Sequence, residues 1–209
     1  FTDGTYYQAW LTTSTDDGAT WSAPTQLTTE SGSIQHLQAV VDGATVYLFW
    51  SRQDTNQRLS YITSTNLTNW SAVATVGQAI GVPAGNTTSN FSIVKLASGT
   101  WVLGWLNVSA VNEVVGVANN LGYPTVHVAT SLNLTSWTSA VELNLPWSQR
   151  WPESVALAQE PGTNTLYAAF DQNVYPWDNY IVTRTSADGV TWAAQTITGF
   201  DHSAAADGH

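Results

Sequence analysis

One short motif occurs four times along this chain, and it limits the fold more than any other feature. Each copy begins with Thr-Ser, continues through Asp or Asn and ends in Trp; the copies span residues 13–21, 63–70, 130–137 and 185–192. Asp, Asn and Gly in the middle favour a tight turn, whereas β-branched and aromatic flanks favour strands. Each copy, here called a kernel turn and numbered 1 to 4 along the chain, is therefore predicted to close a β-hairpin.

A second predicted hairpin precedes kernel turns 2, 3 and 4. Its apolar strands flank an Asp-Gly, Ser-Gly or Pro-Gly turn, in segments 39–50, 93–105 and 155–170. Two hairpins per unit make a four-stranded meander. The kernel tryptophans follow one another at intervals of 49, 67 and 55 residues, which fits the repeat length of roughly 40 to 50 residues of propeller blades if the later units carry loop insertions. We therefore predict an all-β fold: a single β-propeller domain over residues 1–209, with about four four-stranded blades.

The two ends of the chain suggest how such a ring closes. Residues 3–10 are assigned to the second strand of a blade, so the first strand is missing there, and residues 201–209 resemble that strand and its turn. Pairing the ends would remove the open edges of the ring. Two alternatives stay open. The chain is a piece of a larger propeller, or its last strand completes a blade in a neighbouring molecule and builds a polymer.

Charge and composition exclude several classes of function. A net charge of -10 with only five Lys plus Arg leaves no basic surface for nucleic acid. The absence of cysteine excludes disulfides and thiolate metal sites, and the four histidines lack ligand spacing, so we expect no metal and no cofactor. No apolar run approaches the roughly 18 to 20 residues of a membrane helix, so no membrane insertion is expected.

Secretion or cell-surface display is the expected location. The chain starts at Phe1 and contains no Met, which favours a processed mature chain or an excised fragment. Asn-x-Ser/Thr triplets would accept glycans in a host with the machinery. They lie at Asn66, Asn69, Asn86, Asn90, Asn107 and Asn133.

Kernel turn 1 carries a resemblance to a known family. Residues 14–21 fit the Asp-box pattern Ser-x-Asp-x-Gly-x-Thr-Trp, and on this motif nearly the whole chain resembles the sialidase-like superfamily of Asp-box (BNR-repeat) propellers. Kernel turn 4 shifts its acid to Asp188, and kernel turns 2 and 3 carry Asn, with Leu in place of Gly, a form that also resembles five-bladed arabinanase-type and fructosidase-type hydrolases. The resemblance implies that the kernel tryptophans are structural and pack between strands; the same reading applies to Trp10, Trp50 and Trp105.

Catalysis is an alternative functional hypothesis and not the leading one. The resemblance implies, for a sialidase, three arginines that grip a carboxylate, a Tyr nucleophile with a Glu partner, and an Asp acid. The chain has Arg52, Arg58, Arg150 and Arg184, but lacks the family's Arg-Ile-Pro entry motif.

An arabinanase-like hydrolase would need carboxylates that converge where the innermost strands begin. Those positions are approximately Gln35 and His36, Asn90, Glu153, and Asp201 and His202. Only Glu153 and Asp201 form a candidate carboxylate pair, and each has the simpler reading of a hydrogen bond to a neighbouring strand. Five blades would also need roughly 250 residues, more than this chain has.

Binding is the leading functional hypothesis. Segments 146–151 and 175–180 place Trp and Tyr beside Asp, Asn, Gln and Arg, the materials of a sugar site, although the two segments could equally pack on each other. We predict a non-catalytic, lectin-like propeller whose partner is a glycan or polysaccharide. The alternatives are a glycoside hydrolase or a fragment of one, and a surface or filament subunit that self-associates by strand exchange through residues 201–209. The predicted ligand-binding residues are Trp147, Arg150, Trp151, Glu153, Trp177, Asp178 and His202.

Overall fold

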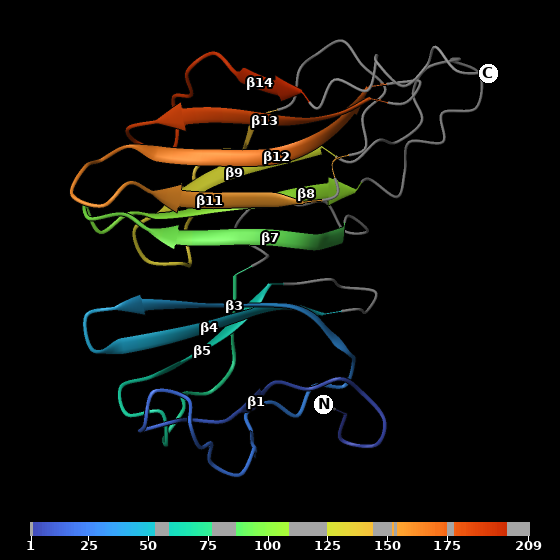
Figure 1. The fold of residues 1–209 in the computed structure, drawn as a ribbon, viewed down its shortest axis with the longest axis vertical. Helices are drawn as coiled ribbons and strands as arrows, with labels where there is room; N and C mark the ends of the chain where they lie inside the picture. The colour runs from blue at the N-terminus through green and yellow to red at the C-terminus, as the bar shows by residue number, and fades with distance from the viewer. Residues whose placement is uncertain are drawn as a thin grey trace.

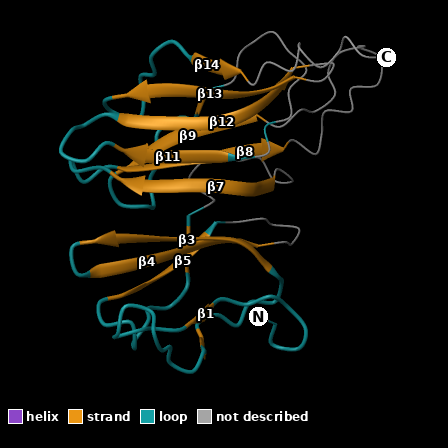
Figure 2. Cartoon of the chain, in the orientation of Figure 1, coloured by secondary structure: helices purple, strands orange, loops and turns teal. Residues whose placement is uncertain are grey.

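The computed structural model describes residues 2–52, 59–76, 87–108, 125–143, 152, 154–174 and 178–199. For residues 87–89, 107–108, 172–174, 178–179 and 199 only the backbone is described. Within these ranges every helix or strand is a β-strand, which confirms the all-β prediction (Figure 2).

The strands form three four-stranded antiparallel sheets and one two-stranded sheet, here called blades 1 to 4 in chain order. Each four-stranded sheet is a meander whose strands keep their sequence order; Figure 1 shows this order for β11 to β14 of the last sheet. Blade 1 holds β1 (Trp10–Leu11) and β2 (Thr25–Gln26). Blade 2 holds β3 (Ile34–Asp42), β4 (Thr45–Arg52), β5 (Ser60–Ser64) and β6 (Ala74–Thr75). Blade 3 holds β7 (Thr87–Lys95), β8 (Trp101–Val108), β9 (Thr125–Ser131) and β10 (Val141–Glu142). Blade 4 holds β11 (Val155–Gln159), β12 (Leu166–Val174), β13 (Asp178–Ser186) and β14 (Thr196–Gly199).

Each kernel turn joins the third and fourth strands of its blade, as the hairpin prediction requires. The serine Oγ accepts the N–H of one residue in the turn, here called the apex residue, and the tryptophan Nε1 donates to the carbonyl of that same residue. The apex residues are Gly18, Leu67, Leu134 and Gly189. All four have positive φ, between 59° and 88°. Four turns of different sequence therefore share one geometry.

The acid of kernel turn 4 is not shifted, contrary to the sequence interpretation. Asp188 stands two residues after Ser186, as Asp16 stands two after Ser14, and its Oδ1 accepts the backbone N–H of Thr191 at 2.7 Å. What differs is the apex, which follows Asp188 directly but follows Asp16 by two residues. Kernel turn 1 thus contains one extra residue between acid and apex.

The assignment of the first strand was wrong. Trp10 pairs with Gln26, and kernel turn 1 connects their two strands, so β1 is the third strand of blade 1 and not the second. The described part of blade 1 therefore has two strands where the other blades have four. Residues 201–209, the predicted closing strand, lie outside the described residues, and ring closure and strand exchange both stay predictions.

The core lies between consecutive blades. Neighbouring residues of one strand face opposite sides: Phe49 belongs to the cluster shared with blade 3, whereas Trp50 belongs to the cluster shared with blade 1. Between blades 3 and 4, Val102 and Leu106 pack with Leu157 and other residues of blade 4. Trp50 and Trp105 are fully buried in these layers, which confirms their predicted structural role.

Three kernel tryptophans pack against the core that their blade shares with the preceding one. Trp70 lies against the blade 1–2 cluster, Trp137 against the blade 2–3 cluster and Trp192 against the blade 3–4 cluster. Trp21 was expected to pack in the same way but is 64% exposed. Among the described residues no blade precedes blade 1, and Figure 1 shows β1 and β14 at opposite ends of the stack.

Candidate functional site at the mouth end of the blades

The kernel turns occupy one end of the sheets, and the other end is here called the mouth end. There the innermost strands begin and the second strands end, as the pairs Ile34 with Arg52, and Val155 with Phe170, demonstrate. The loops 64–73 and 43–44 of blade 2 both lie at the opposite end, because Ser64 pairs with Val46. Side chains at the mouth end of different blades can therefore converge on one ligand. The kernel turns lie at the opposite end of the sheets, away from such a ligand.

A β-bulge recurs at the mouth end of two inner strands. In blade 2 the register shifts between Ile34 and Leu37, and in blade 3 it shifts between Thr88 and Phe91. The first bulge contains His36 and the second contains Asn90. Both residues had been predicted at the starts of inner strands, and that placement is confirmed. Bulges re-aim side chains and are over-represented beside active sites.

His36 begins an aromatic row that crosses from blade 2 into blade 3. Its ring meets Phe91 edge to face at a centroid distance of 4.9 Å. Phe91 lies opposite Trp105, and Trp105 lies opposite His127, whose ring centroid is 5.6 Å from that of the indole. The hydroxyl of Thr125 lies 2.7 Å from His127 Nε2. The row joins blades 2 and 3 beside the two bulges, because His36 lies in the first bulge and Phe91 directly follows the second.

Burial favours the neutral form of both histidines of this row. Burial lowers the pKa of His127, and burial also lowers the pKa of His36, against a smaller opposing effect of a hydrogen bond with the backbone of Phe91. A neutral imidazole has one donor and one acceptor nitrogen. His36 and the Asn90 amide are thus chemically suited to hydroxyl groups, which also donate and accept.

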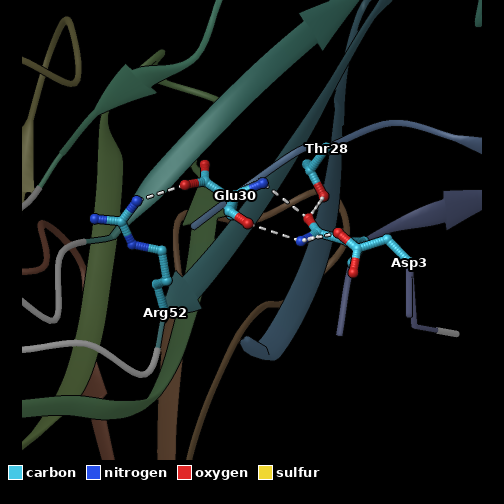
Figure 3. A network of polar contacts seen from close by, with 5 residues as sticks. Asp3, Thr28, Glu30 and Arg52 are labelled. Atoms are coloured by element: carbon cyan, nitrogen blue, oxygen red, sulfur yellow. Dashed lines mark hydrogen bonds and ion pairs between the residues drawn. The ribbon is translucent and has the colours of Figure 1, made fainter. Parts of the chain in front are cut away.

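A polar network fixes the chain where it passes from blade 1 into blade 2, as Figure 3 shows. Arg52 Nη1 pairs with Glu30 Oε2, and the Glu30 backbone exchanges two hydrogen bonds with the Gln8 side chain. Gln8 also binds Asp3 and the Thr28 hydroxyl. Arg52, one of the arginines considered for a carboxylate grip, is therefore oriented by a nearly buried carboxylate.

A second carboxylate at the mouth end is likewise engaged. Asp171 Oδ1 accepts the backbone N–H of Ser154 at 2.8 Å and its hydroxyl at 3.0 Å. Ser154 directly precedes the inner strand of blade 4, so this contact anchors the start of β11. The Glu30 carboxylate thus accepts from the Arg52 side chain, and the Asp171 carboxylate accepts from the residue that precedes an inner strand.

Most of the predicted ligand-binding residues lie outside the described residues. These are Trp147, Arg150, Trp151, Glu153, Trp177 and His202, together with Asp201 of the alternative catalytic pair and Arg58. Asp178 begins β13, opposite Val174, and only its backbone is described. The strand ends that flank these segments, Glu142, Val155, Val174 and Asp178, are all at the mouth end.

The asparagines of the predicted N-glycosylation triplets lie in different parts of the fold. Asn66 and Asn133 sit in kernel turns, where each side-chain oxygen accepts backbone N–H groups, and both residues are exposed. Asn69 is also exposed, and Asn90 lies in β7. Asn107 is described by its backbone alone and Asn86 not at all. Glycosylation stays a prediction at each of them.

Two further classes of feature were sought in the described ranges. No group of three or more His, Asp or Glu side chains is placed there to hold a metal ion. No helix in those ranges has the length and apolar character needed to cross a bilayer.

Comparison with known proteins identifies the architecture. No family model and no curated protein matches the sequence. Among solved structures, the chain is similar to the GH93 α-L-arabinofuranosidase of Fusarium graminearum in complex with arabinobiose, at 14% identity and a TM-score of 0.64, over 93% of this chain and 58% of that one. It is also similar to the α-L-arabinanase of Penicillium chrysogenum complexed with arabinobiose, at 14% identity and a TM-score of 0.52, over 91% and 66%.

A third similar structure is the Hadza microbial sialidase Hz136, at 14% identity and a TM-score of 0.53, over 78% of this chain and 38% of that one. The chain thus spans between about two fifths and two thirds of the length of these structures. At such low identity the likeness concerns the fold and not the chemistry. Four-stranded antiparallel meanders stacked face to face, together with these neighbours, establish that the chain has a β-propeller fold.

Proposed function

We propose that this chain is a non-catalytic, lectin-like propeller that binds a glycan at the mouth end. The observation that supports this most is the recurring bulge that sets His36 and Asn90 at the starts of adjacent inner strands. Side chains re-aimed from two neighbouring blades can hold one ligand between them, and neutral polar groups beside aromatic rings suit sugar hydroxyls and the apolar faces of sugar rings.

The structural neighbours support the ligand class. Two of them were solved with arabinobiose, and the N-acetylgalactosamine deacetylase from F. plautii, similar at a TM-score of 0.53, was solved with the blood group B trisaccharide. An oligosaccharide is accordingly the first ligand to test. The proposed contacts beyond His36 and Asn90 are the predicted residues Trp147, Arg150, Trp151, Glu153, Trp177, Asp178 and His202.

Two of the described carboxylates at the mouth end are already engaged within the chain, which supports binding rather than hydrolysis. Glycoside hydrolysis needs one carboxyl group that gives up a proton and another that attacks or activates water. Glu30 and Asp171 are instead committed to Arg52 and Ser154. The hydrolase alternative, supported by the enzymes among the neighbours, rests on Glu153 and Asp201. The Asp-box affiliation and secretion or surface display are part of the same proposal.

The test is a glycan array followed by titration calorimetry with arabino-oligosaccharides and the strongest array hit. Asn90→Ala and Trp151→Ala should each weaken binding by about tenfold or more, because polar and aromatic contacts dominate such sites. Leu132→Ala is the matched control, since Leu132 is 79% exposed in kernel turn 3, at the opposite end of the sheets. A folded protein that binds no glycan would contradict the proposal.

Hydrolysis is tested on the same protein by the release of reducing sugar. The proposal predicts binding without turnover. Turnover that Glu153→Gln abolishes, while binding persists, would replace the lectin reading with the hydrolase alternative, in which Glu153 takes part in proton transfer.

A further inference from the structure

A groove lies between kernel turns 3 and 4, at the end of the sheets opposite the proposed glycan site. Its volume is about 440 Å³, within the range of roughly 300 to 1,000 Å³ that is typical of small-molecule sites. One wall belongs to blade 3 and the other to blade 4, and both blades have four strands. The groove is thus formed between two consecutive blades and not at either end of the stack.

Hydroxyl groups dominate the blade 3 wall of the groove. They belong to Thr100, Thr130, Ser131, Ser136 and Thr138. Ser136 takes part in the hydrogen bonds of its turn through its backbone N–H and carbonyl, and no described residue forms a hydrogen bond with its hydroxyl. This wall therefore offers a ligand a series of groups that both donate and accept hydrogen bonds.

The blade 4 wall contributes a carboxylate. Asp188 is exposed and carries the only formal charge among the described residues that line the groove. Hydrogen bonds from the backbone N–H of Thr191, and then from that of Val190, lower the pKa of the Asp188 carboxyl below its ordinary value of 3.8. The groove is therefore negatively charged at neutral pH, in a chain whose net charge of -10 also attracts cations.

The packing of Gly189 fixes this carboxylate beside the hydroxyl groups. A Cβ atom at Gly189 would lie 2.8 Å from Thr130 Cγ2 and 3.0 Å from Val102 Cγ2, so the backbone of kernel turn 4 lies directly on blade 3. Asp188 precedes Gly189, and its Oδ1 accepts two backbone N–H groups of the same turn. The charge and the hydroxyl wall are thus held together by the junction of the two blades.

We propose that this groove is a second ligand site and that it binds an amino sugar through its ammonium group. An ammonium group has three hydrogen-bond donors and no acceptor, so it matches the Asp188 carboxylate and the Ser136 hydroxyl. The other hydroxyl groups of the wall suit the sugar hydroxyls, for which a simple amine has no equivalent. The site lies away from the mouth end and does not depend on the glycan proposed to bind there.

The test is a titration of the whole chain followed by heteronuclear NMR. The probe is the β-linked trimer of glucosamine; cellotriose and chitotriose differ from it only in carrying a hydroxyl or an acetamide in place of the ammonium group. The glucosamine trimer should bind about threefold to tenfold more tightly than the other two, as expected for a partly exposed charged hydrogen bond. The amide signals of residues 130–138 and 185–192 should shift most.

Asp188→Asn removes the charge and keeps the turn. Kernel turn 3 already has asparagine at this position, where Asn133 Oδ1 accepts two backbone N–H groups as Asp188 Oδ1 does. The variant should therefore fold normally and bind the glucosamine trimer no more tightly than cellotriose. Asp16→Asn is the matched control, because it removes the equivalent charge from kernel turn 1, which does not line the groove; it should leave the preference intact.

Several results would overturn the proposal. Equal affinity for the three trimers would show that no ammonium group is recognised. Equal losses in Asp188→Asn and Asp16→Asn would mean that only the net charge of the chain matters. Equal binding of putrescine, an amine without hydroxyl groups, would mean that the groove does not recognise a sugar.

The two proposed sites can fail separately. Asn90→Ala should weaken glycan binding at the mouth end and leave the shifts of kernel turns 3 and 4 unchanged. Shifts caused by the glucosamine trimer that are confined to the mouth-end strand residues, and that Asn90→Ala removes, would place this ligand in the first site and contradict the second.

Discussion

Leu67 and Leu134 hold the same position in neighbouring kernel turns, but their surroundings differ. Both have positive φ, 59° and 64°, and both donate their N–H to the serine of the turn. Leu134 is 3% exposed and Leu67 is 40% exposed. Kernel turn 3 rests on blade 2, which has a second strand, whereas kernel turn 2 faces blade 1, of which only the third and fourth strands are described.

The comparison shows that packing on the preceding blade determines whether burial of the apex side chain offsets the strain of its left-handed backbone. A left-handed backbone costs a residue with Cβ about 1–2 kcal/mol, whereas full burial of a leucine contributes about 1.5–3 kcal/mol. Burial in the blade 2–3 core thus offsets the backbone strain of Leu134. Leu67 is less buried, so burial offsets less of its strain. At Gly189 the preceding blade leaves no room for any side chain.

The largest effect is expected from Gly189→Ala. The new Cβ would overlap Thr130 Cγ2 and crowd Val102, in addition to adopting a φ of 76°. Strain and overpacking together should lower the free energy of unfolding by about 2–4 kcal/mol, measured by urea denaturation. Gly99→Ala is the matched control, because Gly99 has a φ of 88° but nothing within 4 Å of the new atom; it should cost only about 1–2 kcal/mol. Equal losses would show that crowding by blade 3 is unimportant.

Leu134→Gly should have the next largest effect. It removes a buried side chain from the blade 2–3 core, a loss of about 2–5 kcal/mol for the equivalent change to alanine, and relieves about 1–2 kcal/mol of backbone strain. The net expectation is destabilisation by about 1–3 kcal/mol, read from the same urea curves. A gain in stability would mean that the packing of this side chain on blade 2 contributes little.

Acid should weaken the packing between blades 2 and 3. His36 and His127 flank it, and burial lowers the pKa of each below the ordinary value of 6.5. The unfolded chain therefore binds protons more readily than the folded one. Stability should be complete above about pH 6.5 and fall as the pH drops below that value toward the folded-state pKa. His127→Gln should make the pH dependence shallower, whereas stability that rises on acidification would contradict this assignment.

Leu67→Gly should have the smallest effect, and of opposite sign to Leu134→Gly. The substitution relieves the left-handed backbone and removes a side chain that is already 40% exposed. We expect a gain of at most about 1 kcal/mol in the free energy of unfolding. A loss as large as that of Leu134→Gly would show that Leu67 is as well packed as Leu134, and the comparison would fail.

The fold was predictable because its main signals are local. A serine followed two residues later by Asp or Asn closes a kernel turn through contacts within eight residues, and this pattern recurs at Ser14, Ser64, Ser131 and Ser186. Four such turns with hairpins between them leave few architectures other than stacked meanders.

The misassigned strand had a signal that was overlooked. Trp10 was grouped with Trp50 and Trp105 because all three are tryptophans near a strand end. Trp10 stands four residues before Ser14, as Ser60 stands four before Ser64, whereas Trp50 stands fourteen before it. Distance to the kernel turn, rather than residue type, identifies the third strand.

The candidate site was predictable only in part. The starts of inner strands placed His36 and Asn90 at the mouth end, but a register shift of one residue leaves no mark in the sequence, so the bulges were not foreseen. The exposure of Trp21 was equally hidden, because it depends on a neighbouring blade and not on the turn itself.

The most direct test of this account is a double-mutant cycle between Gly189→Ala and Thr130→Ser. Thr130→Ser removes the methyl group that the new Cβ would meet at 2.8 Å and keeps the hydroxyl that lies near Thr138. If kernel turn 4 rests on Thr130 and Val102 of the preceding blade, Thr130→Ser should restore about 1 kcal/mol or more in the Gly189→Ala background, beyond its effect alone. Strict additivity of the two substitutions would contradict the account.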